Sequence, residues 1–178
     1  MRIISGSLGG RQFEAPKGRR THPMSDKMRG ALFSMLGDLS GLTLLDAFAG
    51  SGALSLEAVS RGVAGVVAID VDKKAYSTMV SNARALDIDK KTLRTIRANA
   101  SSWSDNNPDA LFDVSLIAPP YDDLQVPLLQ KLARHTKPNG LYVLDWPGQM
   151  QPPELEGLEK LAQRGHGDAQ LVFYRKTS

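Results

Sequence analysis

The sequence has 178 residues, 42% of them hydrophobic, and a formal net charge of +3, which is enough for one well-buried core without a second full domain. It contains no cysteine and only three scattered histidines, which excludes disulfides, thiolate catalysis and cysteine-based zinc sites, so we expect no metal site. The first residues form no apolar signal region and no stretch is long enough for a membrane span, which predicts a soluble, cytoplasmic protein.

Basic residues are concentrated near the N-terminus. Residues 1–30 contain seven basic and two acidic side chains, a local charge of +5, whereas the remaining residues sum to about −2. Such an asymmetry indicates a surface that binds a polyanion, with a solvated basic tail as the alternative. For Arg29, inside a predicted helix, an intramolecular ion pair is an equal alternative. The candidates for phosphate contacts are Arg2, Arg11, Lys17, Arg19, Arg20 and Arg29.

The first elements of the chain are short. Residues 2–14 predict two short strands around a glycine-rich turn, which together form a small basic hairpin. Residues 15–23 have the proline, glycine and charge content of a linker. Ser25 or Asp26 then caps a helix whose apolar residues keep helical spacing as far as Leu36. We therefore expect a basic N-terminal hairpin and linker over residues 1–22 and a main domain over residues 23–178.

From residue 42 onward, short apolar runs alternate with longer amphipathic ones, which predicts a parallel sheet with crossover helices. The last two runs, 158–164 and 169–175, flank a turn at 165–168 and predict an antiparallel hairpin at the sheet edge. The other expected strands are 43–47, 65–69, 93–96, 113–117 and 141–144. The expected helices are 53–61, 73–86, 100–106 and 126–135.

A glycine-rich turn follows the first parallel strand. Gly50 and Gly52 lie between that strand and the first long helix, where the backbone must pass close to a ligand. Asp70, eighteen residues past Gly52, ends the second strand, where an acid can bind ribose hydroxyls. Together these features predict an adenosine-type cofactor, whereas the two glycines alone would also suit an ordinary turn between strand and helix.

Two residues argue against a dinucleotide. Ser55 stands where a third glycine would admit the pyrophosphate, and Asp46 at the strand end would repel it. A carboxylate at Asp46 suits the ammonium of an amino acid, so the cofactor that fits best is S-adenosylmethionine. Asn99, after the third strand, can accept a hydrogen bond from adenine and donate one, with a turn-forming role as the alternative. The expected cofactor-binding residues are Asp46, Ala47, Phe48, Gly50, Gly52, Ala53, Asp70, Val71, Asn99 and Ala100.

The fourth strand ends abruptly in Ala118, Pro119, Pro120 and Tyr121, which we expect to form the catalytic site. Proline has no N–H to donate, so the carbonyls before and between the prolines stay free of ladder bonds. Free carbonyls beside an aromatic ring suit an exocyclic amine on a flat base. A rigid strand exit with a packed loop aromatic is the alternative.

Several segments together resemble the RsmD-type 16S ribosomal RNA guanine-N2 methyltransferases. The opening Arg-Ile-Ile-Ser-Gly and the Phe-Ala-Gly-Ser-Gly-Ala-Leu of residues 48–54 are particular to that family. The resemblance runs from end to end, through residues 2–6, 26–33, 45–54, 119–121 and 167–171.

The resemblance implies an α/β, Rossmann-like class I S-adenosylmethionine-dependent methyltransferase fold. Its sheet would have seven mostly parallel strands with an antiparallel terminal hairpin and a small N-terminal β-hairpin extension. It also implies S-adenosylmethionine as cofactor and a guanine of small-subunit ribosomal RNA, or of a subunit assembly intermediate, as substrate. We expect a monomer.

Position 118 is the main departure from the family, which normally has Asp there. In the family, the guanine stacks on Tyr121 and its amine donates to the residue-118 side chain and to the Pro119 carbonyl. Losing one such hydrogen bond costs about 2 to 4 kcal/mol, or roughly 30- to 1000-fold in rate. Asp122 or Asp123 is a candidate substitute acceptor.

Three functions follow from these features. The first is guanine-N2 methylation of ribosomal RNA. The second is a catalytically impaired member that binds S-adenosylmethionine and RNA without efficient methyl transfer. The third, a nucleotide-dependent oxidoreductase, is disfavoured by Ser55 and Asp46.

Overall fold

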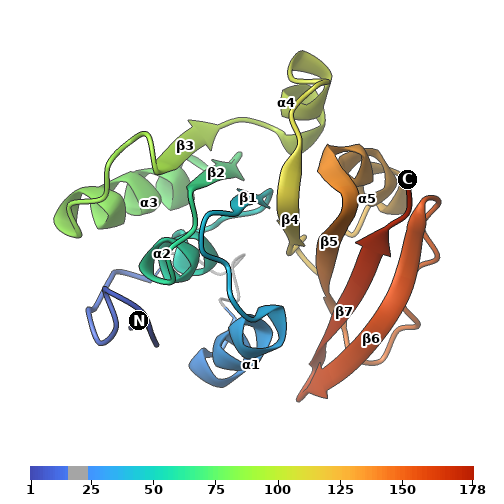
Figure 1. The fold of residues 1–178 in the computed structure, drawn as a ribbon, viewed down its shortest axis with the longest axis horizontal. Helices are drawn as coiled ribbons and strands as arrows, with labels where there is room; N and C mark the ends of the chain where they lie inside the picture. Colours follow the sequence, from blue (N-terminus) through green and yellow to red (C-terminus); the bar gives the residue numbers. More distant parts are fainter. Residues whose placement is uncertain (16–23) are drawn as a thin grey trace.

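The computed structural model describes residues 1–15 and 24–178, which fold around a seven-stranded sheet of order β3-β2-β1-β4-β5-β7-β6 (Figure 1). Strands β1 to β5 are parallel, and β7 runs antiparallel to both β5 and β6. The strands are β1 (Thr43–Asp46), β2 (Gly65–Asp70), β3 (Leu93–Arg97), β4 (Phe112–Ile117), β5 (Thr136–Pro147), β6 (Leu158–His166) and β7 (Ala169–Lys176). The helices are α1 (Asp26–Leu36), α2 (Ala53–Ser60), α3 (Lys73–Ala85), α4 (Ala100–Asn106), α5 (Val126–Leu132) and the 3-10 helix η1 (Ala133–His135).

Helices cover both faces of the sheet. Successive strand residues point to opposite faces, so Leu44 and Leu45 of β1 enter two different cores. On one face the strands pack against α1, α2 and α3, and on the other against α4 and α5. This burial on both faces explains the nearly continuous apolar runs of the parallel strands. Within the described residues, no helix is long and apolar enough to cross a membrane.

The predicted Rossmann-like methyltransferase fold is confirmed, with two local differences. Strand β5 begins at Thr136, because Thr136 pairs with Phe112 of β4 before a register shift that the Pro138-Asn139-Gly140 segment accommodates. The helix expected over 126–135 ends at Leu132 and continues as a 3-10 turn to His135, immediately before β5.

The N-terminal segment forms a short antiparallel hairpin, in which Arg2 bridges to Gln12 and the N–H groups of Ile3 and Phe13 donate to the carbonyls of Arg11 and Met1, each at 2.9 Å. Other backbone groups of this segment bind α2: the N–H groups of Ile4 and Ser5 donate to the Glu57 carboxylate at 2.8 and 3.1 Å. This segment is therefore docked on the main domain, with its Ile3 and Phe13 side chains buried in the same core as α1 to α3. Residues 16–23, with the predicted phosphate-binding Lys17, Arg19 and Arg20, lie outside the described residues.

Candidate functional site

The candidate site lies where β1, β2 and β4 end. These strands are parallel, so their carboxyl ends meet at one edge of the sheet. The chain adds β2 and β3 on one side of β1 and then crosses over to add β4 on the other. A reversal of this kind opens a crevice between the two central strands, where α/β proteins bind ligands. Asp46, Asp70 and Ala118 stand at or just beyond these three strand ends.

Asp46 is a buried acid with an incomplete set of partners. It ends β1 and is 1% exposed. One carboxylate oxygen, Oδ2, accepts a hydrogen bond from the Ser55 hydroxyl at 2.7 Å, while Oδ1 is buried and has no partner. Burial raises the pKa of Asp46 to about 7, with a smaller contribution from the nearby Asp70 carboxylate, and the Ser55 hydrogen bond opposes the rise. An unpartnered carboxylate oxygen beside a ligand crevice suits a cationic group such as an ammonium.

The glycine turn is fastened to Asp70. Gly50 and Gly52 have φ values of +59° and +88°, which side chains other than glycine rarely adopt. The Gly50 N–H donates to Asp70 Oδ2 at 2.8 Å, and the Asp72 N–H donates to Oδ1 at 2.9 Å. Burial raises the pKa of Asp70, and these backbone hydrogen bonds oppose the rise. Each oxygen keeps a second lone pair, so Asp70 can still accept hydrogen bonds from the hydroxyls of a ribose.

The remaining predicted cofactor residues surround this turn, with one change of role. Asn99 Oδ1 caps α4 by accepting from the N–H groups of Ser101 and Ser102, so only its amide group is free to meet an adenine. Val71 follows Asp70 and is 62% exposed, which leaves an apolar surface beside the acid for a flat base. Ala47, Ala53 and Ala100 are buried and Phe48 is partly buried. The residues present thus fit S-adenosylmethionine.

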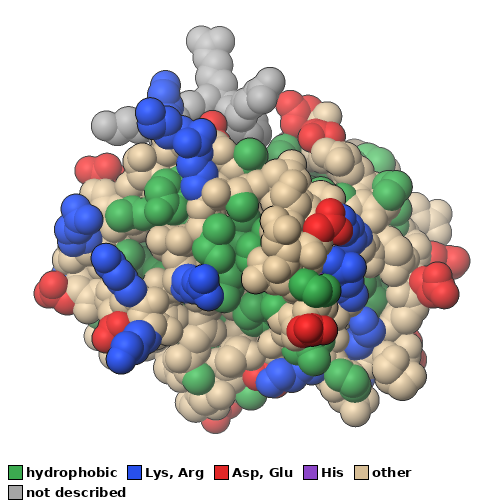
Figure 2. All heavy atoms as spheres, turned by 90° about the horizontal axis from the view of Figure 1, so that it is seen from above, with side chains coloured by type: hydrophobic (Ala, Val, Ile, Leu, Met, Phe, Trp, Pro, Cys, Tyr) green, Lys and Arg blue, Asp and Glu red, His purple; other side chains and the backbone are tan. Residues whose placement is uncertain are grey.

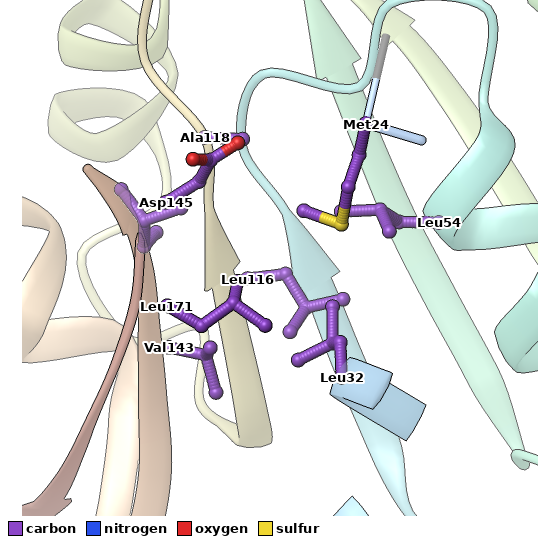
Figure 3. Close-up of a pocket in the computed structure, with 9 residues that line it drawn as sticks. Met24, Leu32, Leu54, Leu116, Ala118, Val143, Asp145 and Leu171 are labelled. Atoms are coloured by element: carbon purple, nitrogen blue, oxygen red, sulfur yellow. The ribbon is translucent and has the colours of Figure 1, made fainter. Parts of the chain in front are cut away.

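The strand end at Ala118 opens into a small cavity. Its walls are apolar side chains from α1, α2, β4, β5 and β7, together with Met24, Ala118 and Asp145 (Figure 3). Tyr121, 43% exposed, does not pack into the core as a loop aromatic would. Its hydroxyl donates to Asp145 Oδ1 and lies 3.2 Å from the Trp146 carbonyl oxygen. Burial raises the pKa of Tyr121, and the Asp145 carboxylate adds to the rise.

The expected substitute acceptors do not reach this cavity. Asp122 and Asp123 are exposed, neither is among the residues that line it, and Asp123 Oδ2 accepts a hydrogen bond from the Gln125 side chain. The acid that does line it is Asp145 of β5, which sequence reasoning missed. A signal existed, because Asp145 directly follows a buried apolar run, as Asp46 and Asp70 do.

The predicted phosphate contacts divide into three groups. Arg2 and Arg11 are exposed near the bridge, whereas Lys17, Arg19 and Arg20 lie outside the described residues. Arg29 is 0% exposed and pairs with Asp26 at 2.8 Å and with the buried Glu57 at 3.6 Å. It therefore holds the fold together and cannot reach a phosphate, which corrects its place among the RNA-binding residues. Figure 2 shows Lys and Arg side chains in several separate groups on one face, among acidic and hydrophobic ones.

Comparisons with known proteins agree with this architecture. "Putative methyltransferase yhhF" from Escherichia coli superimposes with a TM-score of 0.88 at 25% identity, over 99% of this chain and 98% of that one. A hypothetical protein of Thermus thermophilus, TTHA0928, superimposes with a TM-score of 0.82 at 28% identity, over 97% and 98% of the two chains.

Two named relatives match over part of the sequence. "Putative rRNA methyltransferase YlbH" of Bacillus subtilis is 45% identical over 82 residues, which are 46% of this chain and 45% of the relative. "Ribosomal RNA small subunit methyltransferase D" of Escherichia coli K12 is 38% identical over 81 residues, 45% of this chain and 41% of the relative. The matched regions thus span less than half of each relative's length.

The family model described as "Conserved hypothetical protein 95" matches residues 1–175, nearly the whole chain. The chain belongs to this family, the RsmD-type family that its motifs resemble.

Proposed function

We propose that this protein transfers a methyl group from S-adenosylmethionine to the exocyclic N2 amine of a guanine in 16S ribosomal RNA, in the cytoplasm and as a monomer. The main support for the proposal is that three structural features lie together at the carboxyl edge of the sheet. They are the half-partnered acid Asp46, the Asp70 carboxylate on the glycine turn, and the proline-terminated strand end at Ala118.

Each residue has a distinct task in binding the cofactor. Asp46 Oδ1 accepts from the ammonium of the methionine part, and Asp70 accepts from the ribose hydroxyls. The exposed Val71 side chain packs against the adenine, and the free amide of Asn99 donates to a ring nitrogen. When bound, S-adenosylmethionine supplies an electrophilic methyl group. Asp46 ends β1, the strand next to β4, and Asp70 ends β2 on the far side of β1, so the methyl group beside the methionine part would face the Ala118 cavity.

The substrate side is supported by the strand end and by the relatives. The two prolines end β4, so the carbonyls of Ala118 and Pro119 are free of the hydrogen bonds that a continuing strand would make. The exposed Tyr121 offers a ring on which a base outside a duplex can stack. Two relatives carry names that state ribosomal RNA methylation. Arg2, Arg11, Lys17, Arg19 and Arg20 would contact phosphates, which positions the RNA without selecting its sequence.

The test is a methyl-transfer assay with labelled S-adenosylmethionine on small ribosomal subunits and assembly intermediates that lack the modification. We expect label in the 16S RNA as N2-methylguanosine after nuclease digestion. Label on another base or on protein, or tight NAD binding with no S-adenosylmethionine binding, would contradict the proposal.

Ala118 favours a second candidate function, in which the protein binds S-adenosylmethionine and RNA but transfers methyl groups poorly. The variant Ala118→Asp separates the two. If the unaltered protein binds S-adenosylmethionine without transferring methyl groups, and the variant gains transfer, the second function holds. Efficient transfer by the unaltered protein would exclude it.

A further inference from the structure

Asp145 lies next to the position where the family's acceptor is missing. Ile117 of β4 pairs with Leu144 of β5 in the parallel register, so Ala118 and Asp145 are the next residues along the same two neighbouring strands. Neighbouring strands are about 4.8 Å apart, so one side chain from β5 can reach the space beside Ala118. Both residues line the same cavity, and Figure 3 shows the Asp145 carboxylate pointing toward Ala118.

We propose that the Asp145 carboxylate is the catalytic acceptor for the target amine and replaces, from the neighbouring strand, the side chain that Ala118 lacks. The proposal rests on the proposed function, because it assigns the residue that holds the amine in that reaction. With this acceptor, methyl transfer can proceed although position 118 is Ala.

The carboxylate has the capacity that this task needs. Oδ1 accepts one hydrogen bond, from Tyr121, and Oδ2 makes none to any described residue. An ionised carboxylate offers about four lone-pair positions, so Asp145 can hold Tyr121 and an amine at the same time. The Pro119 carbonyl supplies a second acceptor for the other amine hydrogen.

No cationic side chain among the described residues occupies the Asp145 carboxylate, so it can accept a hydrogen bond from the target amine. The cavity walls from α1, α2, β4 and β7 are the apolar side chains of Leu32, Leu54, Leu116 and Leu171. No lysine or arginine forms a salt bridge with Asp145 among the described residues. A carboxylate placed in apolar surroundings without a cation costs stability, and such costs concentrate at functional sites. If its only role were to bind Tyr121, an uncharged Asn would suffice.

The reaction balances as follows. The amine nitrogen forms a bond to the methyl carbon while the bond from that carbon to sulfur breaks, and its electron pair stays on sulfur as a neutral thioether. The nitrogen then carries an excess proton, which passes to Asp145 or to water. The Asp145 hydrogen bond draws the lone pair out of the ring and aligns it with the methyl group. Tyr121 fixes the acceptor through its hydroxyl, so the stacking ring and the acceptor are placed together.

The central experiment compares Asp145→Asn, Ala118→Asp and the double variant with the unaltered protein. Asp145→Asn keeps an oxygen for Tyr121 but loses the charge, and we expect kcat to fall about 100- to 1000-fold, with KM for RNA and the affinity for S-adenosylhomocysteine unchanged. In the double variant, Ala118→Asp should restore kcat to within about tenfold of the value for the unaltered protein. Asp109→Asn, an exposed substitution of the same kind, is the matched control.

A second measurement does not depend on turnover. Carbon-13 NMR of the Asp145 carboxyl group is followed in the cofactor-free protein during titration with guanosine monophosphate and with inosine monophosphate, which lacks the N2 amine. We expect a saturable change with guanosine monophosphate alone, absent in Asp109 signals.

The outcomes separate the two proposals. If Asp145→Asn keeps kcat within about threefold of an active unaltered protein, the acceptor role is wrong and the proposed function stands. If only proteins with Ala118→Asp transfer methyl groups, the substrate is right and the acceptor role is again wrong. If no variant transfers methyl groups, the proposed function fails, and an equal NMR response to both nucleotides then overturns the acceptor role.

Discussion

The Ser55 hydroxyl donates a hydrogen bond to Asp46 at 2.7 Å, and both side chains are buried beneath the glycine turn. Ser55 therefore has two consequences for the cofactor site. Its side chain occupies the place where a dinucleotide-binding turn keeps a glycine for close approach of pyrophosphate. Its hydroxyl also orients Asp46 so that one oxygen is satisfied and the other is left for a ligand.

Asp46→Asn should stabilise the free protein at neutral and higher pH. The pKa of Asp46 is raised from 3.8 to about 7, so its stabilising contribution is complete below about pH 4 and is lost as pH rises through 7. The difference corresponds to at most about 4 kcal/mol at pH 8. Urea unfolding at pH 5 and pH 8 should show a gain for the variant that is larger at pH 8, and calorimetry should show weaker S-adenosylmethionine binding. An equal gain in stability at both pH values would contradict the raised pKa of Asp46.

Glu57→Gln should loosen the N-terminal segment. Glu57 is fully buried and accepts from the N–H groups of Ile4 and Ser5 while it pairs with Arg29 and Arg61. A Gln amide would turn a donor toward donors and leave Arg29 without its buried counter-charge, at a cost of about 3 to 5 kcal/mol. Urea unfolding should show this loss, and hydrogen exchange at Ile4 and Ser5 should accelerate.

The control for this prediction is Asp26→Asn. Asp26 also contacts Arg29, at 2.8 Å, but its side chain is 53% exposed. Exposed ion pairs contribute about 0 to 1 kcal/mol, so this variant should change the free energy of unfolding little. Equal losses for both variants would show that the buried carboxylate is not what holds residues 1–15 in place.

The central part of the site could be predicted because it depends on strand ends. Asp46 and Asp70 each directly follow an apolar run, and parallel strands bring such residues to one edge whatever the details of packing. The same logic placed the Ala118 strand end beside them. The alternation of apolar and amphipathic runs predicts the parallel sheet and its crossover helices, whereas the order of the strands and the reversal that makes the crevice come from the structure.

The missed contacts depend on pairs far apart in sequence. Asp145 reaches Ala118 only because β5 lies next to β4 in a register that includes a shift between Phe112 and Val114, and no local pattern encodes this shift. Arg29 has an ordinary helical position, and its buried partner Glu57 lies on a different helix. The hairpin itself forms, but the docking of its Ile4 and Ser5 N–H groups on Glu57 of α2 joins residues more than 50 positions apart, which no local pattern encodes.

Arg19→Gln with Arg20→Gln should weaken RNA binding in a salt-dependent way. If both residues contact phosphates, their loss should reduce the slope of log affinity against log salt by about 1.4, from about 0.7 per contact on single-stranded RNA. Fluorescence anisotropy with a 16S RNA fragment at several salt concentrations measures this slope. The charge-matched control is Lys90→Gln with Lys91→Gln, two exposed residues just before β3. If both pairs of substitutions reduced the slope equally, the effect would come from the net charge of the protein and not from phosphate contacts of Arg19 and Arg20.

Tyr121→Phe should move the pH dependence of methyl transfer without removing the stacking ring. Burial raises the pKa of Asp145 to about 6, and the Tyr121 hydrogen bond opposes this rise. An acceptor must be ionised, so kcat of the unaltered protein should climb as pH rises through about 6 and then level off. Without the hydroxyl the pKa of Asp145 rises further, and the climb should occur at higher pH.

Among the described residues, Tyr121 is the titratable side chain that hydrogen-bonds Asp145. The other side chains that line the cavity, from α1, α2, β4, β5 and β7 together with Met24, are apolar. A shift in the profile can therefore be assigned to this pair. Tyr76→Phe on α3 removes a hydroxyl away from the cavity and should leave the profile in place. In the Asp145→Asn variant, the residual kcat should no longer rise with pH near pH 6. If Tyr121→Phe lowered kcat equally at every pH, the hydroxyl would act on the fold or on the base instead of on the ionisation of Asp145.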